Sequence, residues 1–588
     1  MLSLSSLLLS GLLYSQLTWA VPSSANRLEP IFARQQESCN TATDRSCWTD
    51  GFDINTDYEI STPLTGVVRN YTLTLTEVDN WTGPDGYVKE KVMLINDDII
   101  GPTIYAQWGD TISVQVINNL KTNGTSVHWH GIRQLDTNLQ DGVNGITECP
   151  LPPNSERVYT YIAHQYGTSW YHSHFSAQYG NGVSGPIHID GPASLPYDID
   201  LGPFVLSDYY HKTADELVIY TKTNGAPPSD NVLFNGTTVD PTTGVGDYAK
   251  ITLTPGKRHR LRLINTSVEN HFQLSIVNHN MTIIASDFVP VDAYTTDSLF
   301  IGVGQRFDVT IDADQDVDNY WFNVTYGGGG LCGSSNNPYP AAIVQYDGAA
   351  DGNPTDQGTT PKDHYCVDTM DIVPVVSRTV PTSFTASTDN TMDVHLDLTA
   401  PTFVWYINNS SEKVDWNKPL SQYVANNETD YPSDLNIWKV DGESQWVYWL
   451  IENDPDSIFS LPHPIHLHGH DFVVLGRSPD ANPITQTSYS FDPSLVKGDN
   501  PVRRDVTMLP AAGWLLLAFK TDNPGAWLMH CHIAWHVAGG LSVTFLERLS
   551  DYRAGMNATD IDVLNSQCTA WDNYFPADDP YPQDDSGI

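Results

Sequence analysis

The segment WLMHCHIAWH, Trp527 to His536, places one cysteine between two histidines and ends on a third histidine. In an extended strand, successive side chains point to opposite faces, so Cys531 should point away from His530 and His532. Zinc has no redox chemistry and would gain nothing from ligands divided in this way. The segment therefore predicts two redox metal sites back to back on one strand.

Three other segments are also rich in histidine: HWHG at 128–131, HSH at 172–174 and HPIHLHGH at 463–470. One His-x-His pair is most often a hydrogen-bonded pair without a metal, but four such segments favour a shared metal site. If each segment is extended, residues two apart share a face. The pairs are His128/His130, His172/His174, His466/His468 and His530/His532. Eight imidazoles exceed the ligands of one ion, which predicts a cluster of two or three metals.

A second metal site is predicted on the opposite face of the same strands. His463 lies an odd number of residues from His466 and His468, so it should face away from them. With Cys531 and His536 it forms the two-histidine, one-cysteine set of a blue copper electron-transfer centre. An electron accepted there would reach the cluster through the cysteine backbone. The path between the two sites crosses one residue of strand on each side of the cysteine, together with side chains and metal bonds. The metals should therefore lie on the order of 10 Å apart.

Strand-like runs of Thr, Val, Tyr and Phe recur between Gly, Pro, Asn and Asp, whereas long helical patterns are scarce. The runs are YTLTLTEV, TISVQVINN, RVYTYIA, GPIHI, ITLTPG, RLRLIN, FDVTI, YWFNVTY, WVYWLI, DFVVLG, LLLAF and LSVTFLE. A chain of 588 residues predicts two to four β-sandwich or barrel domains. Predicted domain boundaries near residues 191–202 and 347–363 divide the mature chain into three similar thirds. The histidine pairs fall in the first and last of these thirds. The cluster should therefore lie between the outer domains.

Charge and targeting signals point to an exported protein. The 70 acidic and 29 basic residues give a net charge of −41, which argues against nucleic acid and anionic membranes as partners. Residues 1–20 are typical of a secretory signal peptide, and residues 21–35 of a propeptide ending near Arg34. No later segment has the 18 or more apolar residues of a membrane span.

Sequons and cysteines also indicate an extracellular glycoprotein. The Asn-x-Ser/Thr sequons, candidate sites for N-linked glycans, are Asn70, Asn80, Asn123, Asn235, Asn265, Asn280, Asn323, Asn408, Asn409, Asn427 and Asn557. Seven cysteines leave six when Cys531 is a metal ligand. Those six could form three disulfides in an oxidising compartment, with fifteen pairings possible.

The four histidine motifs, in this order, resemble those of the multicopper oxidases, and nearly the whole mature chain is similar to the ascomycete-type fungal laccases. Other matching stretches are VSGPIHIDGPASLPYDIDLG, SDNVLFNGT, GKRHRLRLINTS, NPVRRDVTMLPAAGWLLLAF and the terminal DSGI. The resemblance implies an all-β chain of three consecutive cupredoxin-like Greek-key β-barrel domains, at 36–192, 193–374 and 375–588. The first and third would share the trinuclear cluster, the second would contribute to the substrate pocket, and the C-terminus would plug a channel toward the cluster.

The resemblance also implies four copper ions and three disulfides. The type 1 ligands would be His463, Cys531 and His536; the type 2 ligands His128 and His466; and the type 3 ligands His130, His172 and His532 for one ion and His174, His468 and His530 for the other. The disulfides would be Cys39–Cys47, Cys149–Cys568 and Cys332–Cys366. Leu541 stands where lower-potential relatives have an axial methionine, so the potential should be higher here.

A laccase takes single electrons from phenols or aromatic amines and reduces O2 to water. By resemblance, Glu269 would accept the proton of the phenol, and His536 would receive its electron. Asp141 would assist proton delivery at the cluster, although an ordinary Asp-Gly turn explains it equally well. The pocket lining implied by the resemblance is Ala226, Pro227, Leu331, Phe403, Trp405, Phe459, Leu461 and Trp535. For each of these taken alone, core packing is the simpler interpretation. Ala534 replaces an acidic residue of some relatives.

Three other functions compete with this hypothesis. An oxidase of ascorbate, bilirubin or ferrous iron would share the copper sites, but an iron oxidase needs acidic residues at the electron-accepting site. A dinuclear zinc hydrolase is disfavoured because Ile132 and Arg133 follow HWHG where Asp-His would stand. A copper carrier would show no oxygen uptake with a phenol. The natural substrate and the biological role, whether lignin degradation, pigment formation or detoxification, stay open, as does the oligomeric state beyond an expected monomer.

Overall fold

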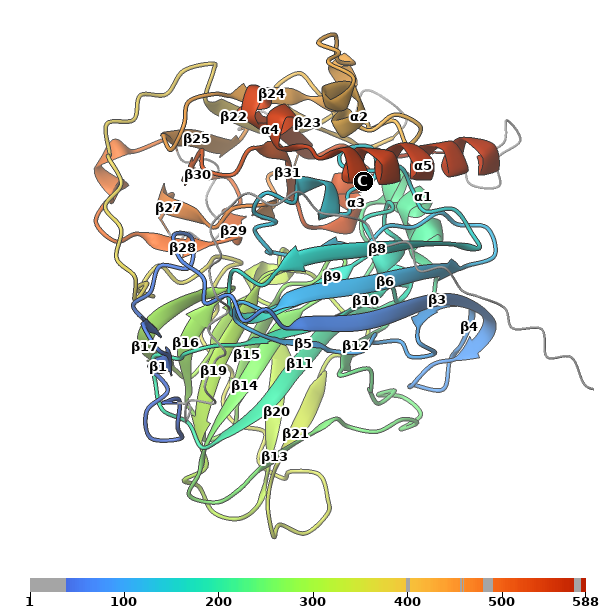
Figure 1. The fold of residues 1–588 in the computed structure, drawn as a ribbon. Coiled ribbons are helices and arrows are strands. Elements are labelled where there is room, and N and C mark those ends of the chain that lie inside the picture. Colours follow the sequence, from blue (N-terminus) through green and yellow to red (C-terminus); the bar gives the residue numbers. More distant parts are fainter. Residues whose placement is uncertain (1–38, 398–401, 455–456, 458, 480–489, 576–582) are drawn as a thin grey trace, which may run out of the picture. The chain divides into compact units, whose positions relative to one another are not determined.

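Three consecutive pairs of β-sheets make up most of the computed structural model (Figure 1). The structure describes residues 39–397, 402–454, 457, 459–479, 490–575 and 583–588. The predicted signal peptide, residues 1–20, and the predicted propeptide, residues 21–35, lie outside the described residues. Each pair of sheets follows the previous one along the chain, which confirms an all-β fold of three barrels in series.

The first pair has strand orders β4-β3-β6-β8 and β5-β10-β9-β7. Its strands are β3 Val68–Thr82, β4 Val88–Ile95, β5 Ile104–Gln107, β6 Thr111–Asn119, β7 His128–Trp129, β8 Ser155–Ile162, β9 Gly167–His172 and β10 Ser184–Asp190, preceded by the hairpin β1 Cys47–Thr49 and β2 Phe52–Asp53. Burial alternates along β6, so Ile112, Val114 and Val116 face the core. This is the period-two pattern that the run TISVQVINN predicts.

The second pair has strand orders β12-β11-β14-β19-β16-β17 and β13-β21-β20-β15-β18. Its strands are β11 Ile199–Tyr209, β12 Asn231–Phe234, β13 Lys250–Leu253, β14 Arg258–Asn265, β15 Phe272–Ile276, β16 Met281–Ser286, β17 Val289–Thr296, β18 Leu299–Ile301, β19 Arg306–Asp312, β20 Asn319–Thr325 and β21 Ala341–Tyr346. It contains none of the predicted metal ligands.

The third pair has strand orders β23-β22-β25-β30-β27-β28 and β24-β32-β31-β26-β29. Its strands are β22 Thr391–Asp397, β23 Val404–Ile407, β24 Ile437–Val440, β25 Trp446–Asn453, β26 His463–Leu467, β27 Phe472–Arg477, β28 Val502–Arg504, β29 Val506–Leu509, β30 Trp514–Lys520, β31 Gly525–Cys531 and β32 Ser542–Glu547. Each sheet pair combines two parallel strand pairs with antiparallel ones: β3 with β6 and β5 with β10, β11 with β14 and β13 with β21, and β22 with β25 and β24 with β32. This repeated pattern shows that the three units share a common core topology, to which the second and third add strands.

In the described part of the chain, five α-helices connect or cover the sheets (Figure 1). They are α1 Ala214–Asn224, α2 Leu420–Ala425, α3 Ala534–Ala538, α4 Leu549–Gly555 and α5 Ala558–Tyr574. A capping box between Thr213 and Glu216 begins α1, and the Asn557 side chain caps α5. Helix α5 buries Leu564, Cys568 and Trp571 and was not predicted from the sequence.

The structure contains the disulfides Cys39–Cys47, Cys149–Cys568 and Cys332–Cys366, and Cys531 is free and buried. These are the pairings that the resemblance implies. The second bridge joins residues 419 positions apart and ties α5 to the first barrel. No helix among the described residues is long and apolar enough to cross a membrane.

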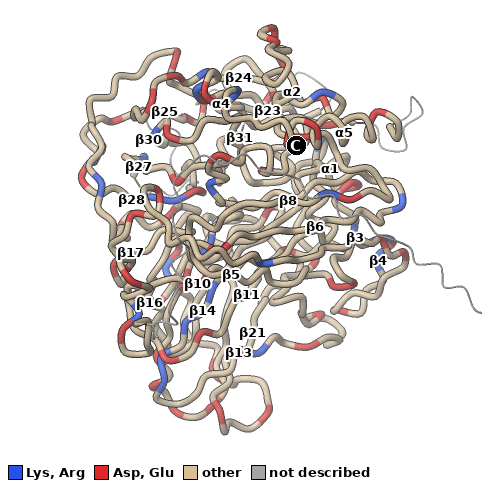
Figure 2. Tube along the Cα trace, in the orientation of Figure 1, with Lys and Arg blue, Asp and Glu red and all other residues tan. Residues whose placement is uncertain are grey.

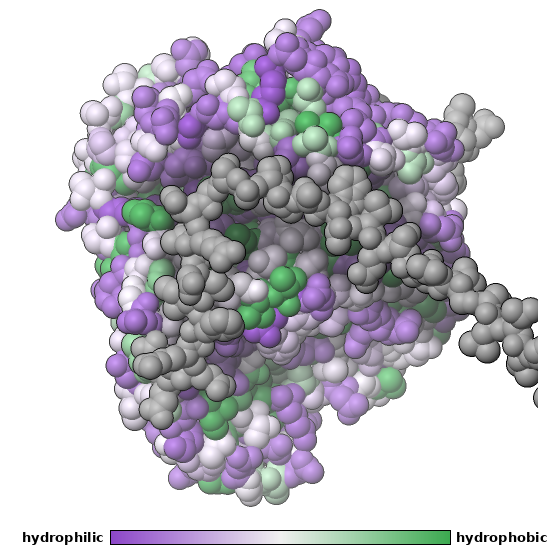
Figure 3. Space-filling view, in the orientation of Figure 1, coloured by the Kyte–Doolittle hydropathy of each residue, from purple (hydrophilic) through white to green (hydrophobic). Residues whose placement is uncertain are grey.

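Acidic residues are spread over the whole trace, whereas basic residues are fewer (Figure 2). Several of those basic residues do not reach the surface, since Arg262, Arg306, Arg503 and Arg504 are fully buried. Where Figure 3 shows described residues, hydrophobic side chains form small separate groups among hydrophilic ones. Buried acidic residues, among them Asp287, Asp308 and Asp505, accompany these arginines.

Removing the bridge at Cys149 and Cys568 should lower stability more than removing Cys39–Cys47. A double serine variant of the first pair loses a cross-link over a very long loop, for which about 2–5 kcal/mol is typical. The Cys39–Cys47 variant is the control, because its loop spans 8 residues. Thermal unfolding and limited proteolysis of α5 measure the difference. Equal shifts for the two variants would contradict the expectation.

Candidate metal centre and adjoining cavity

Four strands bring the histidine motifs together, each near its end. His128 begins the short strand β7, His172 ends β9, His466 lies in β26, and Cys531 ends β31. The second histidine of each pair lies just beyond its strand: His130 and His468 are in turns, His532 is in a bend, and His174 is in an irregular segment. The four segments are therefore extended only in part, because each strand ends before the second histidine of its pair. The turns after HWHG and HLHG use glycines at positive φ, Gly131 and Gly469.

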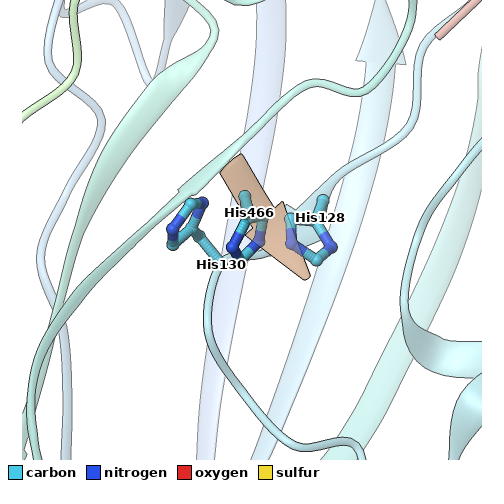
Figure 4. A group of neighbouring side chains, drawn as sticks. All are labelled: His128, His130 and His466. Atoms are coloured by element: carbon cyan, nitrogen blue, oxygen red, sulfur yellow. The ribbon is translucent and has the colours of Figure 1, made fainter. Parts of the chain in front are cut away.

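All eight paired histidines lie in one buried cluster between the first and third barrels. Groups whose donor atoms lie within 4.8 Å of one another are His128/His130/His466, His130/His172/His532 and His174/His468/His530. In Figure 4 the rings of His128, His130 and His466 lie side by side. The His130 and His466 rings are stacked, with centroids 3.9 Å apart. The structure thus joins histidines that are up to about four hundred residues apart in sequence.

Hydrogen bonds fix which nitrogen of several rings is free to bind a metal. The Nδ1 atom of His128 donates to the carbonyl oxygen of Asp141 at 2.8 Å, and Nδ1 of His466 donates to that of Asp505 at 2.8 Å. Their Nε2 atoms have no hydrogen-bond partner among the described residues. A histidine whose Nδ1–H is held by a carbonyl presents an Nε2 lone pair, which is the usual arrangement of a metal ligand.

The spacing of donor atoms also fits metal binding. The Nε2 atoms of His468 and His530 lie 3.4 Å apart, and Nε2 of His532 lies 3.2 Å from Nδ1 of His130. Two ligands on a tetrahedral ion with bonds of about 2.0–2.1 Å are about 3.3 Å apart. The imidazoles are therefore already placed at the separation that shared ions require.

The second predicted site lies on the other face of β31. The Cys531 Sγ atom is 3.5 Å from Nδ1 of His463 and 3.5 Å from Nδ1 of His536, and those two nitrogens are 3.1 Å apart. His463 begins β26 and His536 lies in α3, which follows the cysteine directly. The Leu541 carbonyl accepts a hydrogen bond from Cys531 N, so this buried leucine packs beside the cysteine.

Burial disfavours the charged forms of ligands in both sites. It lowers the pKa of His463 to about 3 and of His530 to about 4, and it raises the pKa of the Cys531 thiol well above its usual value. Neutral imidazoles keep their lone pairs in acid, and a bound cation would deprotonate the thiol outright. The donor set is therefore suited to a soft or borderline redox metal such as copper.

Two buried aspartates support the cluster from opposite sides. Asp141 accepts a hydrogen bond from His468 Nδ1 at 2.8 Å, and its carbonyl holds His128. Asp505 was not predicted, although it lies in the matching stretch NPVRRDVTMLPAAGWLLLAF. Its carboxylate is bound by both terminal nitrogens of Arg306, at 2.6 and 2.7 Å, while its carbonyl holds His466.

A cavity opens beside the cysteine site. It is lined by Val218, Thr221, Lys222, Gly225, Ala226, Glu269, Leu396, Phe403, Trp405, Phe459, Leu461, Trp535, His536, Ala538 and Gly539. Pro227 and Leu331 are not among the lining residues, and Leu331 packs instead near the Cys332–Cys366 disulfide. The residues of α1 and Leu396 were missed, because their apolar periodicity is that of any buried helix or strand.

Glu269 is the acidic side chain that lines this cavity. Burial, and then the negative charge of Asp208, raise the pKa of Glu269 to about 8. Its Oε2 atom is buried without a hydrogen-bond partner among the described residues. A carboxyl group in this state can take up and release a proton near neutral pH.

The C-terminus is buried rather than frayed. Ile588 is 1 % exposed, Trp416 Nε1 donates to the Gly587 carbonyl at 2.8 Å, and Ser586 Oγ donates to the Val537 carbonyl at 2.7 Å. Val537 belongs to α3, the helix of His536. The last residues thus pack against the element that carries one ligand of the cysteine site.

Comparison with known proteins shows the class of this chain. Three models described as "Multicopper oxidase" match residues 75–194, 200–349 and 383–551. The chain belongs to the multicopper oxidases and is a copper-dependent oxidoreductase with three cupredoxin-like domains.

Its relatives include fungal laccases. The chain is 66 % identical to "Laccase" of Cryphonectria parasitica, over 99 % of each chain, and 63 % identical to "Laccase-1" of Melanocarpus albomyces, over 94 % of this chain and 90 % of that one. The crystal structure of laccase from Botrytis aclada superposes with a TM-score of 0.85 at 39 % identity, covering 94 % of this chain and all of that one. Fet3p, a multicopper oxidase that functions in iron import, is 24 % identical with a TM-score of 0.75, which shows a shared fold.

Replacing Asp141 by alanine should weaken metal retention at the cluster. His468 would lose the acceptor that orients its ring, and loss of such a partner typically costs about 10- to 100-fold in metal affinity or activity. Copper remaining after dialysis against a chelator measures the effect. Asp141→Asn keeps an acceptor oxygen and should lose less, so equal losses in the two variants would point to general unfolding instead.

Proposed function

We propose that this chain is a secreted laccase, which oxidises phenols and aromatic amines by one electron at a type 1 copper and couples this to reduction of O2 to water at a trinuclear copper cluster. The observation that carries the proposal is the division of ligands around Cys531. Its sulfur shares one face with His463 and His536, whereas His530 and His532 belong to the buried cluster on the other face. The high identity to laccases over nearly the full length supports the same activity.

Four copper ions fit the donor sets. The type 1 ion would be held by His463, Cys531 and His536, the type 2 ion by His128 and His466, and the type 3 ions by His130, His172 and His532 and by His174, His468 and His530. When bound, copper supplies the electron transfer, with single electrons accepted at the type 1 ion and four delivered to O2 at the cluster. Asp141 would position His128 and His468 and relay protons, and Leu541, beside Cys531, would supply no ligand atom to the type 1 site.

The cavity beside His536 would hold the aromatic substrate. Phe403, Trp405, Phe459 and Trp535 supply flat apolar walls, which suit a phenol ring and exclude water around it. We keep Pro227 and Leu331 as proposed contacts with longer substrates. His536 lies in the lining, so a bound ring would contact a ligand of the type 1 site directly.

Glu269 would accept the proton that a phenol loses on oxidation. Only the carboxylate form can act as the base, and its pKa of about 8 means that the acid form predominates below that pH. Proton acceptance therefore improves as the pH rises toward 8. A phenol that loses its proton and electron together avoids a high-energy radical cation.

The apolar cavity favours phenols over ferrous iron, the substrate of the competing iron oxidase hypothesis. Iron(II) needs oxygen ligands from several carboxylates. Of the described residues that line the cavity, Glu269 is the only carboxylate. The 24 % identity to Fet3p supports the fold alone.

We further propose export, glycosylation and the domain limits 36–192, 193–374 and 375–588, with a C-terminal plug. Most sequon asparagines are at least partly exposed, but Asn123 and Asn265 are fully buried and would not carry glycans on the folded chain. The protein would act as a monomer, with no nucleic acid or membrane partner.

Cys531→Ser should abolish the strong visible absorption and phenol oxidation together, because serine cannot supply the thiolate of a blue copper centre. Metal analysis should give four copper ions for the wild type and three for the variant. An optical spectrum and oxygen uptake with a phenol measure both. Retention of the visible band in the variant would refute the proposed type 1 site.

Glu269→Gln should slow phenol oxidation by about 100-fold, the lower end of what a general base contributes. The rise of rate with pH below 8 should also disappear. Ferrocyanide, which loses no proton on oxidation, should be oxidised at the wild-type rate at every pH. Steady-state kinetics with both donors from pH 4 to about 9 test this, and equal slowing of both donors would exclude a proton-accepting role.

A further inference from the structure

We propose that Asp208 is a positioning residue for the oxidation of phenols, and that it holds Glu269 in place for proton acceptance. This inference rests on the proposed role of Glu269. Asp208 is the next-to-last residue of β11 and is 7 % exposed. Asp208 does not line the cavity, so it would act through Glu269.

The Asp208 carboxylate binds three consecutive backbone amides. One oxygen accepts from Val268 N at 2.9 Å, and the other accepts from Glu269 N at 2.9 Å and Asn270 N at 3.0 Å. Hydrogen bonds from backbone N–H groups to an ionised carboxylate are short and strong. A single side chain thus fixes the backbone on both sides of Glu269.

The Glu269 side chain has no comparable anchor of its own. None of the hydrogen bonds found among the described residues involves its carboxyl group, and its Oε2 atom is buried. The place of that carboxyl in the cavity therefore depends on its backbone, and so on Asp208.

A second contact aligns the same loop with the electron-accepting histidine. The Val268 carbonyl accepts a hydrogen bond from Ala534 N at 2.9 Å, at the first residue of α3. His536 lies two residues further along this helix. Asp208 therefore sets the position of Glu269 relative to His536, as well as relative to its own barrel.

The charge of Asp208 also acts on Glu269. Burial raises the pKa of Asp208 to about 6 in spite of the three amides, so Asp208 is ionised at neutral pH and makes ionisation of Glu269 harder. Other titratable groups around Glu269 are Tyr179, Tyr210, Cys531, and the cavity residues Lys222 and His536. Removing the charge at Asp208 should lower the pKa of Glu269, whereas a glutamate there keeps the charge and moves it.

The test compares copper-loaded full-length variants with a phenol and with ferrocyanide across pH. Asp208→Asn should lower kcat/KM for the phenol at least tenfold, without changing ferrocyanide oxidation. It should also shift the acid limb of the pH–rate profile for the phenol to lower pH. Asp208→Glu should lower kcat/KM for the phenol while the acid limb of the pH–rate profile stays in place. If the asparagine variant does not fold, this variant alone tests the positioning role. Asp230→Asn is the matched control, because Asp230 lies beside β11 but bonds His211 and Asn336 rather than the loop.

A double-mutant cycle separates positioning from general stability. If Asp208 acts through Glu269, Asp208→Asn should change phenol oxidation less than twofold in a Glu269→Gln background. The same tenfold loss in that background would overturn the inference, as would an equal loss for ferrocyanide. If Glu269→Gln alone oxidises phenol like the wild type, the proposed base has failed, and the positioning role fails with it.

Discussion

The antiparallel pairing of β26 with β31 is the constraint on which both candidate metal sites depend. Its register places His466 opposite His530 and Ile465 opposite Cys531. Because neighbouring side chains alternate, His463 and Cys531 lie on one face and His466 and His530 on the other. A slip of one residue would exchange the faces and give each site the wrong donors. The two sites therefore share the end of β31, where Cys531 is joined by peptide bonds to His530 and His532.

The middle barrel supports the cluster without supplying a ligand. Arg306 of β19 binds the Asp505 carboxylate, whose backbone carbonyl orients His466. A Cβ atom added to Gly304 would lie 2.9 Å from His532, so the loop before β19 packs directly on the cluster. A buried ion pair adds little to the free energy of unfolding. Loss of one partner is strongly destabilising, however, because it leaves an uncompensated buried charge. Its value here is to fix one relative position of the barrels, which is what a site divided between two of them requires.

Much of the fold could be predicted from local patterns. The strand-like runs, such as TISVQVINN and RVYTYIA, lie on strands because alternating burial leaves a period of two in the sequence. The division of the donors between two sites followed from side-chain parity, even though each strand ends before the second histidine of its pair. What local patterns could not provide was contact across the chain. Two such contacts are the ion pair of Arg306 with Asp505 and the hydrogen bonds of Asp208 to the backbone amides of residues 268–270. Nothing near these charged residues in the sequence indicates their partners, which only the fold brings together.

The positions of Asp208, Glu269 and α3 explain how proton and electron acceptance can be adjusted separately. The electron would leave through His536, whose donor atom is fixed by Cys531 and His463 at the end of two strands. The proton would leave through Glu269, whose loop is held by a different strand, β11. A change at Asp208 can therefore alter the position of the Glu269 carboxyl, while Cys531 and His463 still hold His536. Substrates that lose no proton should then be insensitive to this loop, and among phenols the sensitivity should grow with the strength of the O–H bond that must be broken.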